Sequence, residues 1–554
     1  MTKKDRARRI FMANSQMFDV AVIGGGHNGL VCAAYLAASG LKVVVLERRK
    51  VVGGAAVTEE FHPGFRNSAA SYTVSLLNPK VIRDLDLPGH GLKVIERRLA
   101  NFLPVDDSRS LIAAPGGRTK QEIARFSARD AERYDAYSDR LDAIADVLRD
   151  IVLRTPPNVI EGGWSAALPQ LVRAGSLGNR LRRLDMVMRR DLLDLFTKSA
   201  ADFLDGWFET PAVQALFGFD SIVGNYASPY HPGTAYVLLH HVFGEVNGKK
   251  GVWGHAVGGM GAITQAMAKS AASRGAVIRT DAAVREVIVE GGRAAGVVTE
   301  AGETIRAGCV VSNLNPKLLY GKLVDPAVLP QDFRERMARF KCGSATFRMN
   351  VALSELPDFT CLPGKTLADH HTSGIIIGPS LDYMDRAYLD AKAGGWSKAP
   401  IIEMLIPSTL DDSLAPPGQH VASLFCQHFD PNLPDGSSWD DHRETVADLI
   451  IDAVNAWAPN FKASVLGRQI NSPLDLERTF GLVGGDIFHG ALSLDQIFSA
   501  RPVLGHGDYR APVPGLYMCG SGTHPGGGVT GAPGHNAARE ILADFKRRRL
   551  RRAA

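Results

Sequence analysis

Cysteine is scarce in this chain, and its placement excludes two kinds of chemistry. The 554 residues include six cysteines: Cys32, Cys309, Cys342, Cys361, Cys426 and Cys519. No two of them form a C-x-x-C pair and none clusters with histidine, which excludes a dithiol redox centre and a zinc ribbon. Scattered thiols are typical of a reducing compartment. Because the cysteines cluster neither with one another nor with histidine, the sequence predicts no metal site.

Long apolar runs are also missing. No stretch of 18 apolar residues occurs, and the first 17 residues, MTKKDRARRIFMANSQM, hold no apolar segment like that of a signal peptide. We therefore expect a chain that does not span a membrane and that is cytoplasmic, or mitochondrial if its source is a eukaryote.

The body of the chain has little excess charge of either sign. The net charge is +5, and the basic excess lies at the two ends, in Lys3–Arg9 and Lys546–Arg552. We interpret residues 1–17 and 546–554 as basic tails, for which two alternatives stay open: a peripheral contact with anionic lipid and a solvated charged end. No nucleic-acid partner is expected, and a homo-oligomer stays open.

The folded part opens with a pattern of strand, turn, helix and strand. FDVAVI at 18–23 and KVVVLE at 42–47 are short apolar runs, and NGLVCAAYLAASG between them is typical of a helix. Gly24, Gly26 and Gly29 form G-x-G-x-x-G at the turn, where the backbone can approach a pyrophosphate beside a helix N-terminus. Glu47 ends the second strand, where its carboxylate can accept hydrogen bonds from both hydroxyls of an adenosine ribose. The pattern predicts a dinucleotide-binding fold.

The segment after Glu47 favours FAD, bound non-covalently, over NAD. It reads RRKVVGGAAV, and Gly53 and Gly54 mark a loop whose backbone passes close to a ligand such as the flavin diphosphate. Near the C-terminus, a short strand enters a glycine-rich stretch and a helix begins near Gly531. A helix N-terminus aimed at the isoalloxazine would stabilise the negative charge of reduced flavin.

The order of the patterns predicts an α/β chain with a discontinuous, Rossmann-type FAD-binding domain. Its expected segments are 18–110, 252–315 and 500–545. The rest is expected to form a substrate domain, with a helical insertion at 111–251 and a mixed or antiparallel sheet at 316–499. No second G-x-G-x-x-G follows a strand, so no nicotinamide domain is expected. The electron acceptor would be oxygen, a quinone or another carrier, unless NAD(P)H enters the substrate cavity.

Six segments carry a resemblance to a known family: VIGGGHNGLVCAAYLAASG, LERRKVVGGAAVTEEFHPGF, YVLLHHVFG, GGMGAI, DLERTFGLVGGDIFHGALSLDQIFSARP and CGSGTHPGGGVTGAPGHNAA. Across nearly the whole chain they resemble the family of pyridine nucleotide-disulfide oxidoreductase domain-containing protein 2. More distantly they resemble phytoene desaturases and carotenoid ketolases. The disulfide of the family name finds no support here, because the cysteine pair is missing.

The resemblance implies a set of FAD contacts. They are Gly24, Gly26, His27, Asn28, Gly29, Glu47, Arg48, Gly53, Gly54, Ala55, Val284, Gly520, Ser521, Val529, Gly531 and Ala532. Ser521 departs from the acidic residue that is commoner at its position in the wider flavoprotein group.

The chemistry expected is hydride transfer to flavin N5 from an apolar, polyene or isoprenoid-like substrate, with the protein orienting the substrate. Candidate catalytic residues are His524, His489, Arg501 and His241. Two alternatives stay open. One is a flavin amine oxidase-like enzyme, and the other is a non-catalytic FAD- or lipid-binding scaffold that resembles Rab escort and GDP-dissociation-inhibitor proteins.

Overall fold

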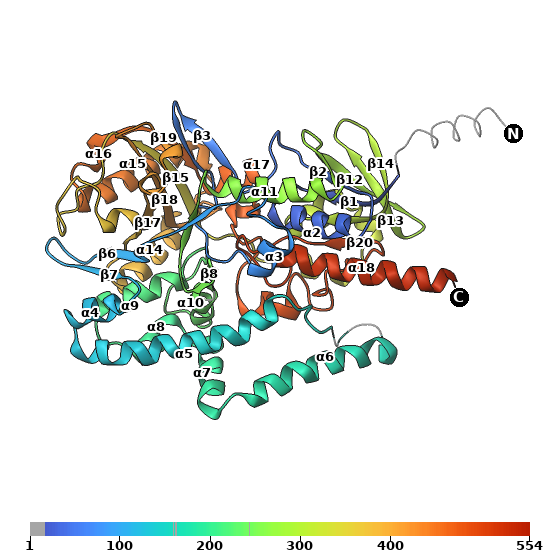
Figure 1. Ribbon diagram of the computed structural model, residues 1–554, viewed down its shortest axis with the longest axis horizontal. Helices are drawn as coiled ribbons and strands as arrows, with labels where there is room; N and C mark the ends of the chain where they lie inside the picture. Colours follow the sequence, from blue (N-terminus) through green and yellow to red (C-terminus); the bar gives the residue numbers. More distant parts are fainter. Residues whose placement is uncertain (1–16, 159, 161–162, 243, 554) are drawn as a thin grey trace.

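The computed structural model describes residues 17–158, 160, 163–242 and 244–553, which form two main sheets with helices around them (Figure 1). The first sheet has the order β11-β2-β1-β14-β13-β12, and β20 also pairs with β14. Its strands are β1 (Phe18–Ile23), β2 (Val43–Leu46), β11 (Val277–Arg279), β12 (Val284–Glu290), β13 (Arg293–Thr299), β14 (Thr304–Ser312) and β20 (Leu516–Met518).

The core of the first sheet is parallel and draws on three distant parts of the chain. β11, β2, β1, β14 and β20 pair in parallel, whereas β12 and β13 continue from β14 as an antiparallel extension. All four residues of β2 are buried, as expected for a strand covered on both faces. This arrangement confirms the predicted α/β, discontinuous Rossmann-type fold.

Beside the first sheet, helix α2 (His27–Ala38) packs against both α11 (Met260–Ser273) and α18 (Ala532–Ala553). The contact between α2 and α18 is so close that a Cβ on Gly534 would lie 2.2 Å from the carbonyl oxygen of Asn28. Small residues at this crossing allow the two backbones to meet.

The second sheet has the order β19-β15-β18-β17-β16-β6-β7, and all neighbours are antiparallel except β16 and β6. Its strands are β6 (Asn101–Pro104), β7 (Ser110–Ala113), β15 (Thr346–Leu353), β16 (Gly374–Ile377), β17 (Trp396–Leu405), β18 (His420–Phe429) and β19 (Val465–Asn471). A mixed sheet is what the sequence predicted.

Strands β6 and β7 correct one predicted boundary. The sequence places residues 18–110 in the FAD-binding domain, but Asn101 pairs with Gly374 of the second sheet. The chain therefore enters the second sheet at β6, some residues before the expected boundary. The reason is that pairing partners more than 250 residues away decide the membership of such a short strand.

The two faces of the second sheet are covered by different helices. Ile376 and Ile401 share a core cluster with α14 (Leu381–Gly394), whereas Ile377 and Ile402 share one with α15 (Trp439–Trp457). Successive strand residues point to opposite faces, so the alternation assigns the helices to opposite sides.

The predicted helical insertion is present below the second sheet in Figure 1. It contains α4 (Arg118–Ala124), α5 (Ala128–Val152), α6 (Gly163–Arg183), α7 (Met186–Thr197), α8 (Ala200–Asp205), α9 (Pro211–Gly218) and α10 (Thr234–Val242).

Shorter strands are β3 (Thr58–His62), β4 (Phe65–Ser68), β5 (Val94–Glu96), β8 (Glu245–Val246), β9 (Lys249–Lys250) and β10 (Gly254–Ala256). The remaining helices are α3 (Pro79–Asp84), α12 (Pro316–Leu318), α13 (Gln331–Ala338), α16 (Phe461–Ser464) and α17 (Pro473–Phe480). Within the described ranges, none of the helices has both the length and the apolar character needed to cross a bilayer.

We predict that Gly534→Ala lowers the thermal midpoint of unfolding, because the added methyl group would meet the backbone of α2. Overpacking of this kind costs about 1–3 kcal/mol. Gly178→Ala in α6 is the matched control, since nothing lies within 4 Å of its Cβ position and alanine is about 1 kcal/mol better than glycine in a helix. Differential scanning calorimetry of both variants tests the packing, and an unchanged midpoint for Gly534→Ala would contradict it.

Candidate cofactor and substrate site

The first glycine loop joins β1 to α2 and is formed by contacts that leave no room for side chains. Gly24 has a φ of +92°, and a Cβ on Gly29 would lie 2.3 Å from the Gly24 carbonyl oxygen. A Cβ on Gly26 would lie 2.6 Å from Nδ2 of Asn313. Gly26 is also the N-cap of α2 and makes no side-chain cap, so the amide groups of this helix end stay available to an anion.

Glu47 lies at the end of β2 beside this loop. Its Oε2 accepts a hydrogen bond from the Gly25 amide at 2.8 Å, and its Oε1 accepts one from the Arg49 amide at 2.9 Å. Each carboxylate oxygen has a second lone pair, so the side chain can still accept hydrogen bonds from two ribose hydroxyls.

The second glycine loop packs directly on the first. The Gly53 amide donates to the Gly25 carbonyl at 2.8 Å, and Gly26 and Gly53 form an isolated parallel bridge. Gly53 and Gly54 have φ values of +130° and +58°. The two loops therefore present adjacent backbone to the same space, as a diphosphate group requires.

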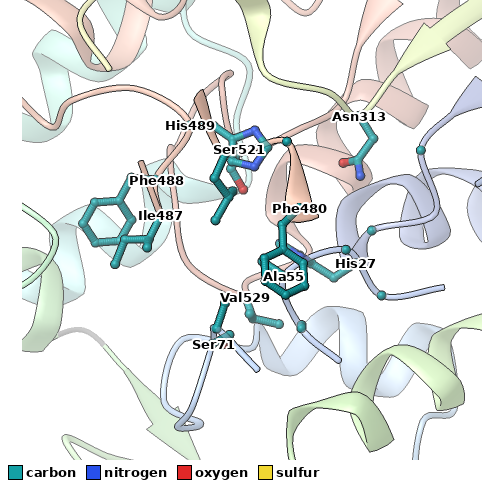
Figure 2. A pocket seen from close by; sticks show the side chains of 18 of the residues that line it. His27, Ala55, Ser71, Asn313, Phe480, Ile487, Phe488, His489, Ser521 and Val529 are labelled. Atoms are coloured by element: carbon teal, nitrogen blue, oxygen red, sulfur yellow. The ribbon is translucent and has the colours of Figure 1, made fainter. Parts of the chain in front are cut away.

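These loops form one wall of a cavity of about 670 Å³ that lies between the two sheets. This volume is within the roughly 300–1,000 Å³ typical of ligand pockets. The cavity begins at the carboxyl ends of β1 and β2, where Ile23 and Leu46 line it, and reaches Asn101 of β6 and Glu403 of β17. Figure 2 shows Ser521, Val529, Phe488 and His489 around this space.

Eleven of the predicted FAD contacts line the cavity: Gly24, Gly26, His27, Glu47, Arg48, Gly53, Gly54, Ala55, Val284, Ser521 and Val529. Two of them are also held by neighbours. Arg48 donates to the Arg478 and Thr479 carbonyls at 3.1 and 2.6 Å, and Ser521 accepts from Nδ2 of Asn28 at 3.1 Å. The structure thus brings together residues from both ends of the chain.

Five other predicted contacts do not line the cavity: Asn28, Gly29, Gly520, Gly531 and Ala532. Gly29 packs on Gly24, and a Cβ on Gly520 would lie 2.6 Å from the Asn313 carbonyl oxygen. These residues lie behind the cavity wall and pack against the residues that form it. Direct contact between them and FAD stays a prediction.

The residues present fit FAD. The glycine loops leave a space that side chains would fill, the uncapped N-terminus of α2 faces the cavity wall, and the Glu47 carboxylate lies at the end of β2. A buried ring nitrogen beside the same loop, Nε2 of His27, has no hydrogen-bond partner among the described residues. Burial lowers the pKa of His27 to about 4, so this ring is neutral near pH 7.

Two of the four candidate catalytic residues line the cavity, His489 and His241. Burial, together with the nearby His27 and Arg501, lowers the pKa of His489 to about 3. Burial lowers the pKa of His241 to about 4, although its Nδ1 lies 2.9 Å from the Val237 carbonyl. Both rings are neutral near pH 7 and suit hydrogen bonding better than proton donation.

The other two candidates, Arg501 and His524, do not line the cavity. The guanidinium of Arg501 is fully buried and donates to five backbone carbonyls: those of Phe488, Gly490, Ala491, Gln496 and Ser521. His524 follows a turn closed by the Thr523 amide and the Gly520 carbonyl, and its Nε2 lies 3.2 Å from the Ile151 carbonyl. Neither side chain is part of the cavity wall, so both support the loops that build it.

The far end of the cavity holds two carboxyl groups that sequence reasoning missed, Asp220 and Glu403. Glu403 accepts a hydrogen bond from the hydroxyl of Tyr72, and burial raises the pKa of Glu403. Burial, together with the charge of Glu403, raises the pKa of Asp220 to about 8. A group that titrates near neutral pH on a cavity wall is a candidate acid or base.

Two buried arginines, Arg348 and Arg97, lie near these carboxyl groups but outside the lining of the cavity. The guanidinium carbon of Arg348 lies 4.6 Å from the centre of the Tyr72 ring, and its Nη2 donates to Ser423 at 2.8 Å. Arg97 donates to the hydroxyl of Thr73. The charges of Arg97 and Arg348 oppose the rise in the pKa of Glu403. A lone acid within the apolar strand IIEML was the available sequence signal for Glu403.

Comparisons with known proteins agree with this site. The family model described as flavin containing amine oxidoreductase matches residues 29–347. The chain is 42% identical to pyridine nucleotide-disulfide oxidoreductase domain-containing protein 2 of Rattus norvegicus, over 96% of this chain and 94% of that protein. It is 26% identical to a phytoene desaturase (lycopene-forming) of Pseudescherichia vulneris, over 93% of this chain and 96% of that protein. These matches confirm the predicted resemblance.

A solved structure of similar fold is cyclohexylamine oxidase from Brevibacterium oxydans. It superposes with a TM-score of 0.56 at 15% identity and covers 96% of this chain and 99% of that one. The family implies FAD as the cofactor, in agreement with the glycine loops and Glu47. The chain belongs to the family of flavin-containing amine oxidoreductases, and it is an FAD-dependent oxidoreductase.

Proposed function

We propose that this oxidoreductase dehydrogenates an apolar, isoprenoid-like substrate. The observation that carries the proposal is the lining of the cavity beyond the glycine loops. It includes seven aliphatic and aromatic side chains: Val74, Leu76, Phe219, Val223, Trp253, Ile487 and Phe488. Such a wall favours a ligand that loses apolar surface to it on binding. The similarity to a phytoene desaturase, whose name states a polyene hydrocarbon substrate, supports the same class.

FAD, when bound, supplies the two-electron acceptor for the hydride. The residues of the chain have three tasks: to hold the substrate, to exclude water and to take up the proton that leaves with the hydride. Phe219, Trp253 and Phe488 provide the apolar surface for the first two tasks. Asp220 suits the third, because its carboxyl group lines the cavity and makes no side-chain hydrogen bond to another described residue.

The competing function is amine oxidation. Asp220 and Glu403 together favour a cationic ammonium group at the far end of the cavity, and the ring of Tyr72 could add a cation–π contact. The two guanidinium groups of Arg97 and Arg348 behind these carboxyls oppose such a cation. We therefore favour the apolar substrate.

We predict that Glu47→Arg loses most of its bound FAD, because the carboxylate oxygens that would face the ribose hydroxyls are replaced by a cation. The measurement is the ratio of flavin absorbance to protein absorbance after purification. Glu335→Arg, at an exposed position of α13, is the matched control and should keep its flavin. Full flavin content in Glu47→Arg would show that the adenosine end lies elsewhere.

We expect the bound flavin to be bleached anaerobically by isoprenoids such as phytoene or geraniol in detergent micelles, and not by cyclohexylamine or putrescine. Stopped-flow absorbance of the flavin band gives the rate for each compound. Rapid bleaching by the amines alone would replace the dehydrogenase proposal with the amine oxidase.

The role of Asp220 predicts a particular pH dependence. A base must be ionised, so flavin reduction should become faster as the pH rises through about 8 and level off above it. Asp220→Asn should slow the step by about 10²–10⁴-fold and abolish this dependence. Asp205→Asn, on the surface of α8, should keep the rate and the profile of the parent protein. A parent-like profile in Asp220→Asn would exclude the carboxyl as the base.

A further inference from the structure

Helices α6 and α7 carry apolar side chains that nothing in the described structure covers. Leu168, Leu171 and Val172 are 65%, 48% and 67% exposed, and their spacing puts them on one face of α6. Met186 and Leu193 on α7 are 57% and 62% exposed. Leu195 is the only residue of α7 that is buried, and no described side chain of α6 is.

A helix of the length of α6 normally depends on the packing of an apolar face. In Figure 1, α6 runs along the lower edge of the molecule, at the periphery of the helical insertion. Its exposed apolar face therefore indicates a binding surface for a partner outside the described structure.

Positive charge surrounds the same face. Residues 163–190 contain six arginines and a single acid, Asp185, which gives this segment a net charge of +5. Arg173, Arg182 and Arg183 form no ion pair with any residue in the described ranges, and the guanidinium of Arg182 donates to the side chain of Asn179. The partner is thus expected to supply negative charge as well as apolar surface.

A second feature lies under α6. A cavity of about 200 Å³ separates it from the end of α5 and from α18, and three arginines line it: Arg154, Arg173 and Arg539. Arg154 donates through Nε to the Asp150 carbonyl, and Arg539 through Nη1 to the Leu153 carbonyl, so both keep other N–H groups available. Guanidinium groups in this number suit a phosphodiester.

The acid that lines this cavity, Glu540, already has hydrogen-bond partners within the protein. Glu540 accepts hydrogen bonds from the Thr155 hydroxyl at 2.7 Å and from Arg510 at 2.8 Å. Its partner Arg510 is shared with Asp508 and Asp544, but the three lining arginines still outnumber this one acid in the cavity.

We propose that α6, α7 and the arginine-lined cavity form a docking surface for an anionic phospholipid bilayer. The exposed leucines and valine enter the boundary between headgroups and acyl chains, and the arginines lie at the level of the phosphates. A second copy of the chain fits less well, because a two-fold contact through this face would bring two segments of +5 together. The surface differs from the basic tail at 546–554, and it does not rest on the proposed substrate.

The surface is also close to the main cavity. Phe196 of α7 contacts Tyr236 of α10 with ring centres 5.0 Å apart, and both pack in a cluster with Phe488, which lines the cavity. One layer of side chains thus separates the docking surface from the wall of the substrate site.

The test is flotation of the FAD-loaded, full-length protein with vesicles of phosphatidylcholine alone and of phosphatidylcholine mixed with phosphatidylglycerol. We expect binding to the mixed vesicles only, weakened by high salt. Arg182→Glu with Arg183→Glu should weaken binding about ten-fold or more, since each basic residue near the surface adds to the affinity. Leu171→Ser with Val172→Ser should weaken it in both low and high salt.

Two matched controls separate this surface from general basicity. Arg334→Glu with Arg336→Glu changes the same number of charges on α13 and should bind like the parent protein. Arg547→Glu with Arg548→Glu tests the C-terminal part of α18 and should retain most of the binding. The flavin spectrum and thermal midpoint of each variant confirm that it is folded.

Three results would overturn the proposal: equal binding to both vesicle types, parent-like binding by the α6 variants, or equal loss in the α13 control. Light scattering after gel filtration gives a fourth. If the parent protein is a dimer that the α6 variants dissociate while vesicle binding stays the same, this face is an interface between two copies.

Discussion

The backbone of the first glycine loop lies against the backbone of the second, and the main cavity is built around that contact. The bond from the Gly53 amide to the Gly25 carbonyl fixes the distance between the loops, and Asn313 closes them from the side of β14. Added side chains at Gly26 or Gly29 would collide with neighbours at 2.6 and 2.3 Å. A site of this kind recognises its ligand through main-chain groups, so a tight fit between backbones determines whether the site exists at all.

The same constraint explains which parts of the structure the sequence could predict. A turn that must admit a phosphate has few solutions, so Gly24, Gly26, Glu47 and Gly53 could be assigned from local order. Each lies on the cavity wall. The fold class followed for the same reason, because alternating helices and parallel strands leave distinctive patterns in sequence.

The far end of the cavity could not be predicted in this way. Tyr72, Asp220 and Glu403 come from three separate segments, and only the meeting of the second sheet with the helical insertion brings them together. A related reason explains why Arg501 and His524 do not line the cavity. Proximity in sequence to a glycine loop does not determine side-chain direction, and both side chains turn toward backbone carbonyls. Likewise, β6 was assigned to the wrong sheet because its partner, β16, is remote in sequence.

Strand β20 pairs with β14 and leads into the residues that close the cavity, Ser521 and Val529. These positions follow the first glycine loop by almost 500 residues. During synthesis on a ribosome, the cofactor site therefore stays incomplete until this late segment has emerged. Domains that fold in order from the N-terminus can secure a ligand early. Here the wall of the cavity is complete only after β20 has paired with β14 and brought in Ser521 and Val529.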